Sequence, residues 1–264
     1  SGGYGLDGVW ADDFHHAVHT ALTGERTGYY ADFDSLAKTG KALRQAWVYD
    51  GQWSSHRRRT RGAKPQGLAP HQLVVAAQNH DQVGNRPDGE RLCALVDTGR
   101  AKAAAALLLT SPFTPLLFQG EEWAASSPFQ YFTDHRDPEL ARQVSEGRRA
   151  EFAGFGRTDR LPDPQDPATF ARSKLRWEEV DESPHREMLE WYRELIALRR
   201  RLPSPSEAVG EGIDVTVDEG ERHIDFSRPG VRVLVNLGTE EWNVQLGGEK
   251  AVTVPPSAVA VMTP

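Results

Sequence analysis

The chain has a single cysteine, Cys93, among its 264 residues. One thiol excludes an internal disulfide, and this cysteine usage fits a cytoplasmic location. The sequence also has no long hydrophobic run, because its most apolar stretch, residues 103–109, is far too short to cross a bilayer. We therefore expect no membrane partner.

An excess of positive charge is also missing, since the net charge is -7 and the isoelectric point is about 5.7. This balance argues against a nucleic-acid partner for the chain as a whole. The most basic run, residues 56–61, has the residue types of a phosphate or nucleic-acid site. Aromatic residues are not interleaved with it, so a solvated loop or a loop at the rim of a substrate site is the favoured interpretation.

The sequence begins with Ser1 and has only two methionines, Met188 and Met262. The first residues have neither a basic nor an apolar segment of the kind found in signal peptides. Because an initiator methionine is missing, we expect a processed chain or a piece of a longer one. The length suits one large domain plus a small one.

A dense polar cluster follows an apolar run in the middle of the first half of the chain. Residues 73–77 are all apolar, which favours a strand buried on both faces of a parallel sheet. The next residues are Gln78, Asn79, His80, Asp81 and Gln82. In a (β/α) barrel the catalytic groups lie at the C-terminal ends of strands. A solvated loop is the competing interpretation, but so many polar side chains directly after the strand favour a site.

Polar residues also follow two other short predicted strands. Residues 6–11 are followed by Asp12 and Asp13, either of which is expected to cap a helix over residues 14–22. Residues 116–118 are followed by Glu121 and Glu122, which are either catalytic carboxylates or charges that favour a helix start. Further helices are expected over residues 35–46, 100–110, 138–151 and 187–201. Alternation of strands and helices predicts a parallel sheet.

Histidine and tyrosine side chains near the start of the chain are further candidates for a polar site. His15 and His19 have the i, i+4 spacing that can bind a metal, but a third ligand is not evident, so we expect no metal. A histidine in a polar pocket or a packed core is the favoured role. Tyr29 lies in an aromatic segment, residues 28–33, that either packs over a barrel rim or stacks on a sugar ring.

The pattern changes to period two beyond residues 203–205, which contain two prolines. Short strands are expected over residues 213–217, 222–226, 231–236, 242–246, 251–254 and 258–262, which predicts a small antiparallel β-sandwich. We therefore predict an α/β protein with two domains. Residues 1–203 form part of a barrel, and residues 204–264 form the β-sandwich.

The polar cluster has the chemistry of a sugar site. Amides and carboxylates suit vicinal hydroxyls, and aromatic rings suit the faces of pyranose rings. Glycoside hydrolysis passes through an oxocarbenium-like transition state and usually needs two carboxylates. Asp81 is the leading candidate for one of them. Hydrolysis of an acetal needs only carboxylates and water, so no cofactor is implied.

Asn79, His80 and Asp81, after a buried strand, resemble the fourth signature region of the α-amylase clan of glycoside hydrolases. A wider, ordered set of motifs resembles one family of that clan, the maltooligosyltrehalose trehalohydrolases. The motifs occupy residues 10–17, 23–25, 28–33, 78–86, 119–122, 146–149 and 163–170. They span nearly the whole chain.

The resemblance implies a (β/α)8 TIM barrel followed by a C-terminal β-domain. It implies hydrolysis of the α-1,4-glucosidic bond next to the terminal trehalose of maltooligosyltrehalose, an α-1,4-glucan oligosaccharide. Asp81 would be the transition-state stabiliser and His80 a substrate hydrogen-bonder, with Arg57 and Tyr29 near the trehalose end. The candidate substrate-binding residues are Gln78, Asn79, His80, Asp13, His15, Tyr29, Arg57 and Arg86.

One departure from the family pattern limits this expectation. The nucleophilic aspartate and the acid/base glutamate of the clan follow the fourth and fifth barrel strands, but no Arg-x-Asp nucleophile motif precedes Trp10 and no matching acid glutamate is present. We therefore expect the C-terminal part of the barrel, about the sixth to eighth strands, with a missing N-terminal part as its partner. Two alternatives are a non-catalytic glucan-binding remnant and another clan enzyme such as a glycogen-branching enzyme.

Overall fold

The computed structural model of the protein describes residues 5–64, 67–153, 161–205, 208–247 and 250–263. The chain divides into two compact units. The first unit comprises Ser1–Ala77, Val96–Leu116 and Trp191–Pro264, and the second comprises Gln78–Leu95 and Leu117–Glu190. In the described part of the chain no helix is long and apolar enough to span a membrane. The predicted domain boundary after residue 203 stays a prediction.

A three-stranded parallel sheet lies in the first unit, as the sequence predicts. Its strands are β1 (Val9–Trp10), β4 (Leu73–Ala76) and β5 (Thr114–Leu116), in the order β1-β4-β5. Both neighbouring pairs are parallel. The strand expected at residues 116–118 begins earlier than predicted and includes Pro115. A proline lacks the N–H that a central strand needs, and it is tolerated here because β5 pairs only with β4 among the described strands.

The helices of the first unit are α1 (Asp12–Thr23), η1 (Gly28–Phe33), α2 (Leu36–Gln45), η2 (Pro70–Gln72) and α5 (Thr98–Thr110). Helix α1 ends at Gly24, which adopts the left-handed conformation that glycine favours. The predicted aspartate N-cap of α1 is wrong. Ala11 occupies the N-cap position, and the Asp13 carboxylate binds other peptide groups.

The predicted antiparallel β-domain is present, with strand bounds close to those expected. Strands β6 (Asp214–Asp218), β7 (His223–Arg228), β8 (Val231–Asn236) and β11 (Ala258–Met262) form one sheet in the order β11-β8-β7-β6. Strands β9 (Trp242–Gly247) and β10 (Lys250–Val254) form a second sheet. Leu234, Val244 and Val254 bring side chains from both sheets into one buried cluster.

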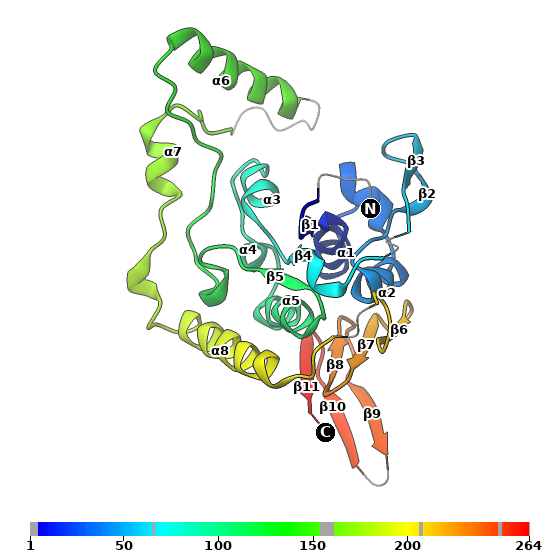
Figure 1. Ribbon diagram of the computed structural model, residues 1–264. Helices are drawn as coiled ribbons and strands as arrows, with labels where there is room; N and C mark the ends of the chain where they lie inside the picture. The colour runs from blue at the N-terminus through cyan, green and yellow to red at the C-terminus, as the bar shows by residue number, and fades with distance from the viewer. Residues whose placement is uncertain (1–4, 65–66, 154–160, 206–207, 248–249, 264) are drawn as a thin grey trace. The chain divides into compact units, whose positions relative to one another are not determined.

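Helices of the first unit also pack on the β-domain. Helix α2 contacts β6 and β7, and helix α5 contacts β8 and β11. Figure 1 shows α5 beside the red strand β11 and α2 beside the orange strands β6 and β7. A hairpin of β2 (Asp50–Ser54) and β3 (Arg59–Gly62) completes this unit.

The second unit is mainly helical. It contains α3 (His80–Gly84), α4 (Leu92–Leu95), η3 (Glu121–Trp123), α6 (Pro138–Ala153), α7 (Pro167–Arg172) and η5 (Trp177–Glu179). Helix α6 lies where the sequence predicts a helix. Helix α7 was not predicted, although Asp166 caps it and Pro167 begins it, which is a common arrangement. Helix α8 (His185–Arg201) begins in the second unit and ends in the first.

Asn236 joins the two sheets of the β-domain. Its fully buried amide donates hydrogen bonds to the carbonyl oxygens of Glu240 (2.7 Å) and Val254 (2.9 Å). Its side-chain oxygen accepts one from the Gly238 N–H at 2.9 Å. Val254 lies on the second sheet, so this side chain connects β8 to β10.

We expect Asn236→Ala to lower the free energy of unfolding by about 2–3 kcal/mol, because it leaves buried peptide groups without partners. Urea unfolding followed by fluorescence measures this change. The matched control is Asn243→Ala, which removes an exposed asparagine of β9 whose hydrogen bond with Thr253 lies at the surface, and it should cost less than about 0.5 kcal/mol. Equal losses in the two variants would contradict the role of Asn236.

Candidate active site

The polar cluster of residues 78–82 folds into a short, capped helix. The Asn79 side-chain oxygen accepts hydrogen bonds from the backbone N–H groups of Asp81 (2.8 Å) and Gln82 (3.3 Å). In return, the Gln82 side-chain oxygen accepts one from the Asn79 N–H at 3.1 Å. This reciprocal arrangement is a capping box, which satisfies N–H groups that a helix start leaves unbonded.

His80 and Asp81 are the exposed members of the cluster. Their side chains are 58% and 65% exposed, whereas Gln78, Asn79 and Gln82 are buried. The His80 Nε2 atom lies 3.5 Å from a carboxylate oxygen of Asp81. The two side chains therefore present an imidazole and a carboxylate together to an approaching ligand.

Gln78 connects this cluster to the α4 region. Its side-chain oxygen accepts a hydrogen bond from the Leu92 N–H at 2.9 Å. Next to Leu92, Arg91 is almost fully buried, and its guanidinium donates to the carbonyl oxygens of Ser127 and Gln119, at 2.7 Å each. These contacts join the start of the polar cluster to the segments around Gln119 and Ser127.

Arg86 lies at the other end of the cluster. Its Nε atom lies 3.4 Å from a carboxylate oxygen of Glu90, in an ion pair between half-buried side chains. This contact directs Arg86 toward Glu90. Contact of Arg86 with a substrate stays a prediction from the sequence.

Glu121 is a buried carboxyl group, and neither of its oxygens has a hydrogen-bond partner. Burial raises the pKa of Glu121 to about 8, and nearby Gln78 and Arg91 offset this effect only in part. The group is therefore protonated in the folded protein near neutral pH. A buried, protonated carboxyl without contact to solvent gives no support to a catalytic role, and a neutral group adds no negative charge at the start of η3 either.

Asp13 is a structural anchor of the first unit. It is 6% exposed, and one of its carboxylate oxygens accepts hydrogen bonds from the N–H groups of Val48 and Tyr49, at 2.8 Å each. Burial raises the pKa of Asp13, while these two hydrogen bonds act in the opposite direction. Its predicted contact with substrate stays a prediction.

His15 is fixed in one tautomer by its neighbours. Its Nδ1 atom lies 2.6 Å from the Ala77 carbonyl oxygen, which only accepts hydrogen bonds, so Nδ1 carries the proton. In the neutral ring Nε2 then accepts from the Tyr30 hydroxyl at 3.0 Å. His15 is 2% exposed, so the structure supports the expectation of a histidine in a packed polar environment.

Tyr29 belongs to an aromatic cluster around η1. Its ring centroid lies 4.5 Å from that of Tyr30 and 5.2 Å from that of His16. His16 also stacks on Phe33 at 5.0 Å. Burial lowers the pKa of His16 to about 4, so this ring is neutral near pH 7. The cluster combines aromatic faces with an uncharged imidazole.

Arg57 lies in the exposed turn of the β2–β3 hairpin, and the run of residues 56–61 is therefore part turn and part strand. The hairpin is anchored by Asp32, which is 7% exposed. Asp32 accepts hydrogen bonds from the Tyr49 hydroxyl (2.7 Å), the Ser54 hydroxyl (2.5 Å) and the Ser55 N–H (2.9 Å). Although burial acts in the opposite direction, these partners hold the pKa of Asp32 below its ordinary value.

The sequence analysis did not single out three side chains that bind backbone groups next to candidate residues: Asp32 in the first unit, and Arg91 and Arg148 in the second. The position of Asp32, a lone acid within an aromatic segment, is a signal that could have indicated a buried anchor. The sequence carries no such signal for Arg91 or Arg148, because both act on groups far away along the chain. In the described part of the chain, no group of three His, Cys, Asp or Glu side chains is arranged to hold a metal ion.

Curated relatives match nearly all of this chain. A malto-oligosyltrehalose trehalohydrolase of Arthrobacter ramosus is 51% identical over 237 residues, which cover 89% of this chain and 40% of the relative. That of Mycobacterium tuberculosis is 44% identical over 251 residues, which cover 94% of this chain and 43% of the relative. The resemblance predicted from the sequence is confirmed.

The chain thus spans about two-fifths of the length of these trehalohydrolases, and the matched region is their C-terminal part. No family model matches the chain. The sequence was expected to lack the N-terminal part of the family pattern, and this partial coverage agrees with that expectation.

Solved structures confirm the fold class. A putative α-amylase from Salmonella typhimurium superposes with a TM-score of 0.85 at 36% identity, covering 97% of this chain and 46% of that one. A cyclic α-maltosyl-(1→6)-maltose hydrolase from Arthrobacter globiformis gives a TM-score of 0.54 at 16% identity, covering 100% of this chain and 46% of that one. This second likeness concerns the fold alone. The chain has the fold of the C-terminal part of an α-amylase-type barrel with its β-domain.

The raised pKa of Glu121 makes the stability of the folded protein depend on pH. A carboxyl group with a higher pKa in the folded than in the unfolded chain binds its proton more tightly when folded. The folded state therefore loses stability as pH rises from the ordinary glutamate value of 4.5 to about 8. Glu121→Gln keeps the shape and cannot ionise, so the variant should lose less stability over this range than the wild type.

Urea unfolding midpoints at a series of pH values measure this difference. We expect the difference in unfolding free energy to shift steadily in favour of the variant as the pH rises. At about pH 8 the variant should be the more stable of the two. Parallel curves for the two proteins would show that Glu121 titrates at its ordinary value.

Proposed function

We propose that the chain supplies the Asp81 side of the active site of an enzyme that releases trehalose from maltooligosyltrehalose. The bond cleaved is the α-1,4-glucosidic bond next to the terminal trehalose, and the substrate is an α-1,4-glucan oligosaccharide. One observation carries the proposal: an exposed carboxylate and imidazole lie on a capped turn directly after a strand of a parallel sheet. The similarity to curated trehalohydrolases supports the choice of substrate.

Asp81 acts in this proposal as the transition-state stabiliser. Positive charge develops on the sugar ring as the glycosidic bond breaks, and a fixed carboxylate lowers the energy of that state. His80 lies close enough to Asp81 to hydrogen-bond the same sugar unit. The backbone hydrogen bonds to Asn79 fix the turn before substrate arrives, so little rearrangement is needed.

The other candidate residues divide by their exposure. Tyr29, Arg57 and Arg86 are exposed or half-buried, and we propose that they contact substrate directly, the first two near the trehalose end. Asp13, His15, Gln78 and Asn79 are buried and hold neighbouring groups. Their proposed role is to fix the walls of the substrate site.

Glycoside hydrolysis needs a nucleophile and a proton donor besides Asp81. The buried Glu121 is unsuited to either role, and the chain spans about two-fifths of its curated relatives. We propose that the N-terminal part of the enzyme supplies both groups and pairs with this chain to complete the barrel. The reaction needs no cofactor, and a cytoplasmic location is the proposed setting.

The test uses a completed enzyme, in which the chain is joined behind the N-terminal three-fifths, approximately, of the Arthrobacter ramosus relative. With maltotriosyltrehalose as substrate, we expect trehalose release by the completed enzyme and none by the chain alone. Asp81→Asn should lower kcat by roughly 10²–10³-fold, because it removes the charge that stabilises the transition state.

Asp88→Asn is the matched control, since it makes the same change at an exposed aspartate that follows α3. It should leave kcat within about two-fold of the wild-type value. Formation of α-1,6 bonds without free trehalose would assign a branching reaction instead. Glucan binding by a folded, completed enzyme that shows no turnover would favour a non-catalytic binding module.

A further inference from the structure

Arg148 makes three contacts with the region around the Asp81 turn. It projects from α6, and its guanidinium donates hydrogen bonds to the Gly84 carbonyl oxygen and to the Asn85 side-chain oxygen, the latter at 3.2 Å. The guanidinium carbon lies 4.6 Å from the centroid of the Tyr131 ring, which it covers. Gly84 is the last residue of α3 and Asn85 is its C-cap, so Arg148 binds the C-terminal end of this helix.

The end of α3 that Arg148 binds is itself hydrogen-bonded to the backbone of Asp81. The Asn85 N–H donates to the Asp81 carbonyl oxygen at 2.9 Å, and the Val83 N–H donates to the Asn79 carbonyl oxygen at 3.1 Å. Helix α3 has only five residues, and so short a helix is not stable by itself. The Asn79–Gln82 capping box holds its start. Arg148 holds its end, where helix carbonyl groups lack partners within the helix.

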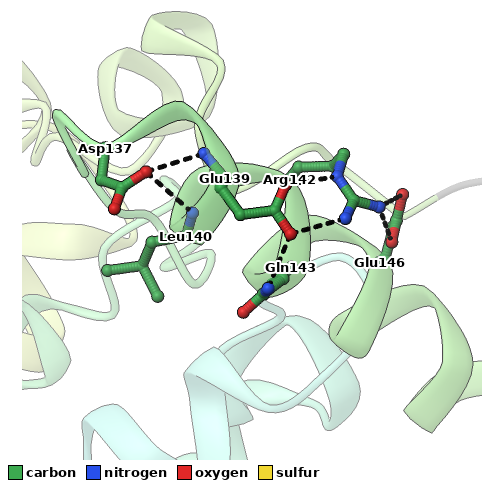
Figure 2. A network of polar contacts seen from close by, with 6 residues as sticks. All are labelled: Asp137, Glu139, Leu140, Arg142, Gln143 and Glu146. Carbon is green, nitrogen blue, oxygen red and sulfur yellow. Dashed lines mark hydrogen bonds and ion pairs between the residues drawn. The ribbon is translucent and has the colours of Figure 1, made fainter.

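Helix α6 is capped at its start and bonded to another segment of the chain near Arg148. Figure 2 shows that the Asp137 carboxylate caps the start of α6 by accepting from the N–H groups of Glu139 and Leu140. Arg142 binds Glu139 and Glu146 on the exposed face of the same helix (Figure 2), and these surface ion pairs do not hold α6 against any other segment. Nearer to Arg148, the Ser145 hydroxyl donates to Asp163 at 2.7 Å.

We propose that Arg148 is a positioning residue that fixes the orientation of Asp81 by holding the C-terminal end of α3. This inference rests on the proposed function for its catalytic consequence. A planar guanidinium suits the task because it donates to two acceptors at once while it covers an aromatic ring. An ammonium group is a compact point charge without the planar fork of a guanidinium, so a lysine is expected to replace Arg148 only in part.

The first experiment measures hydrogen exchange in the chain itself. The amides of Val83, Asn85 and Arg86 donate within the α3 turn, and their exchange reports on its opening. In Arg148→Ala we expect these amides to exchange about ten-fold faster or more, with Arg148→Lys intermediate. Arg142→Ala is the matched control, because it removes an arginine from the same helix that has no contact with α3.

The second experiment measures turnover of maltotriosyltrehalose by the completed enzyme. A displaced Asp81 weakens binding of the transition state more than binding of the substrate, so Arg148→Ala should lower kcat by about ten-fold and change KM little. The fraction of folded enzyme, measured by its melting curve, corrects for any loss of protein. Arg142→Ala should keep the wild-type kcat.

The results separate this inference from the proposed function. Unchanged exchange of the three amides in Arg148→Ala would overturn the positioning role, whatever the activity. Faster exchange with an unchanged kcat would also overturn it, because the turn would then move without affecting catalysis. A wild-type completed enzyme that releases no trehalose would refute the proposed function, and the exchange measurements would still decide whether Arg148 fixes the Asp81 turn.

Discussion

The reciprocal hydrogen bonds between Asn79 and Gln82 are the interaction on which the candidate site depends. They convert a run of polar residues into one turn of helix with a defined face. A helix of this length gains too little from its own hydrogen bonds to persist alone, so side chains must hold both ends. Once the amides of Asn79 and Gln82 are used in this way, His80 and Asp81 are the members of the cluster left on the surface.

Ionisable groups in this protein have three different environments. Asp32 and Arg91 are buried and make several hydrogen bonds, which include backbone groups of Ser55 for Asp32 and of Gln119 and Ser127 for Arg91. Asp81 is exposed and keeps its charge available for a ligand. Glu121 differs from both, because burial without partners favours its neutral form. Exposure and hydrogen bonding, more than residue type, separate a candidate catalytic carboxylate from a structural one.

Much of the fold could be predicted because its signals are local. The alternating apolar residues of β7 specify a strand whose buried side chains lie on one face, and the apolar run before Gln78 specifies a buried strand. The strand expected at residues 116–118 was misplaced, because β5 accommodates Pro115: among the described strands it pairs only with β4. The expected aspartate N-cap of α1 failed for a tertiary reason: Val48 and Tyr49 bind the Asp13 carboxylate. Arg148 could not be predicted, since nothing near residue 148 indicates that its partner is Gly84.

We propose that Asp81 stabilises the positive charge of an oxocarbenium-like transition state. The most direct test compares how the completed enzyme and its Asp81→Asn variant bind two ligands: a cationic iminosugar, which imitates that charge, and a neutral maltooligosaccharide. Titration calorimetry measures both affinities. The variant should lose roughly 100-fold or more in iminosugar affinity, because only the charged ligand resembles the transition state. Its affinity for the maltooligosaccharide should change by less than about three-fold. Equal losses for both ligands would contradict this proposal and would make Asp81 a general sugar-binding residue.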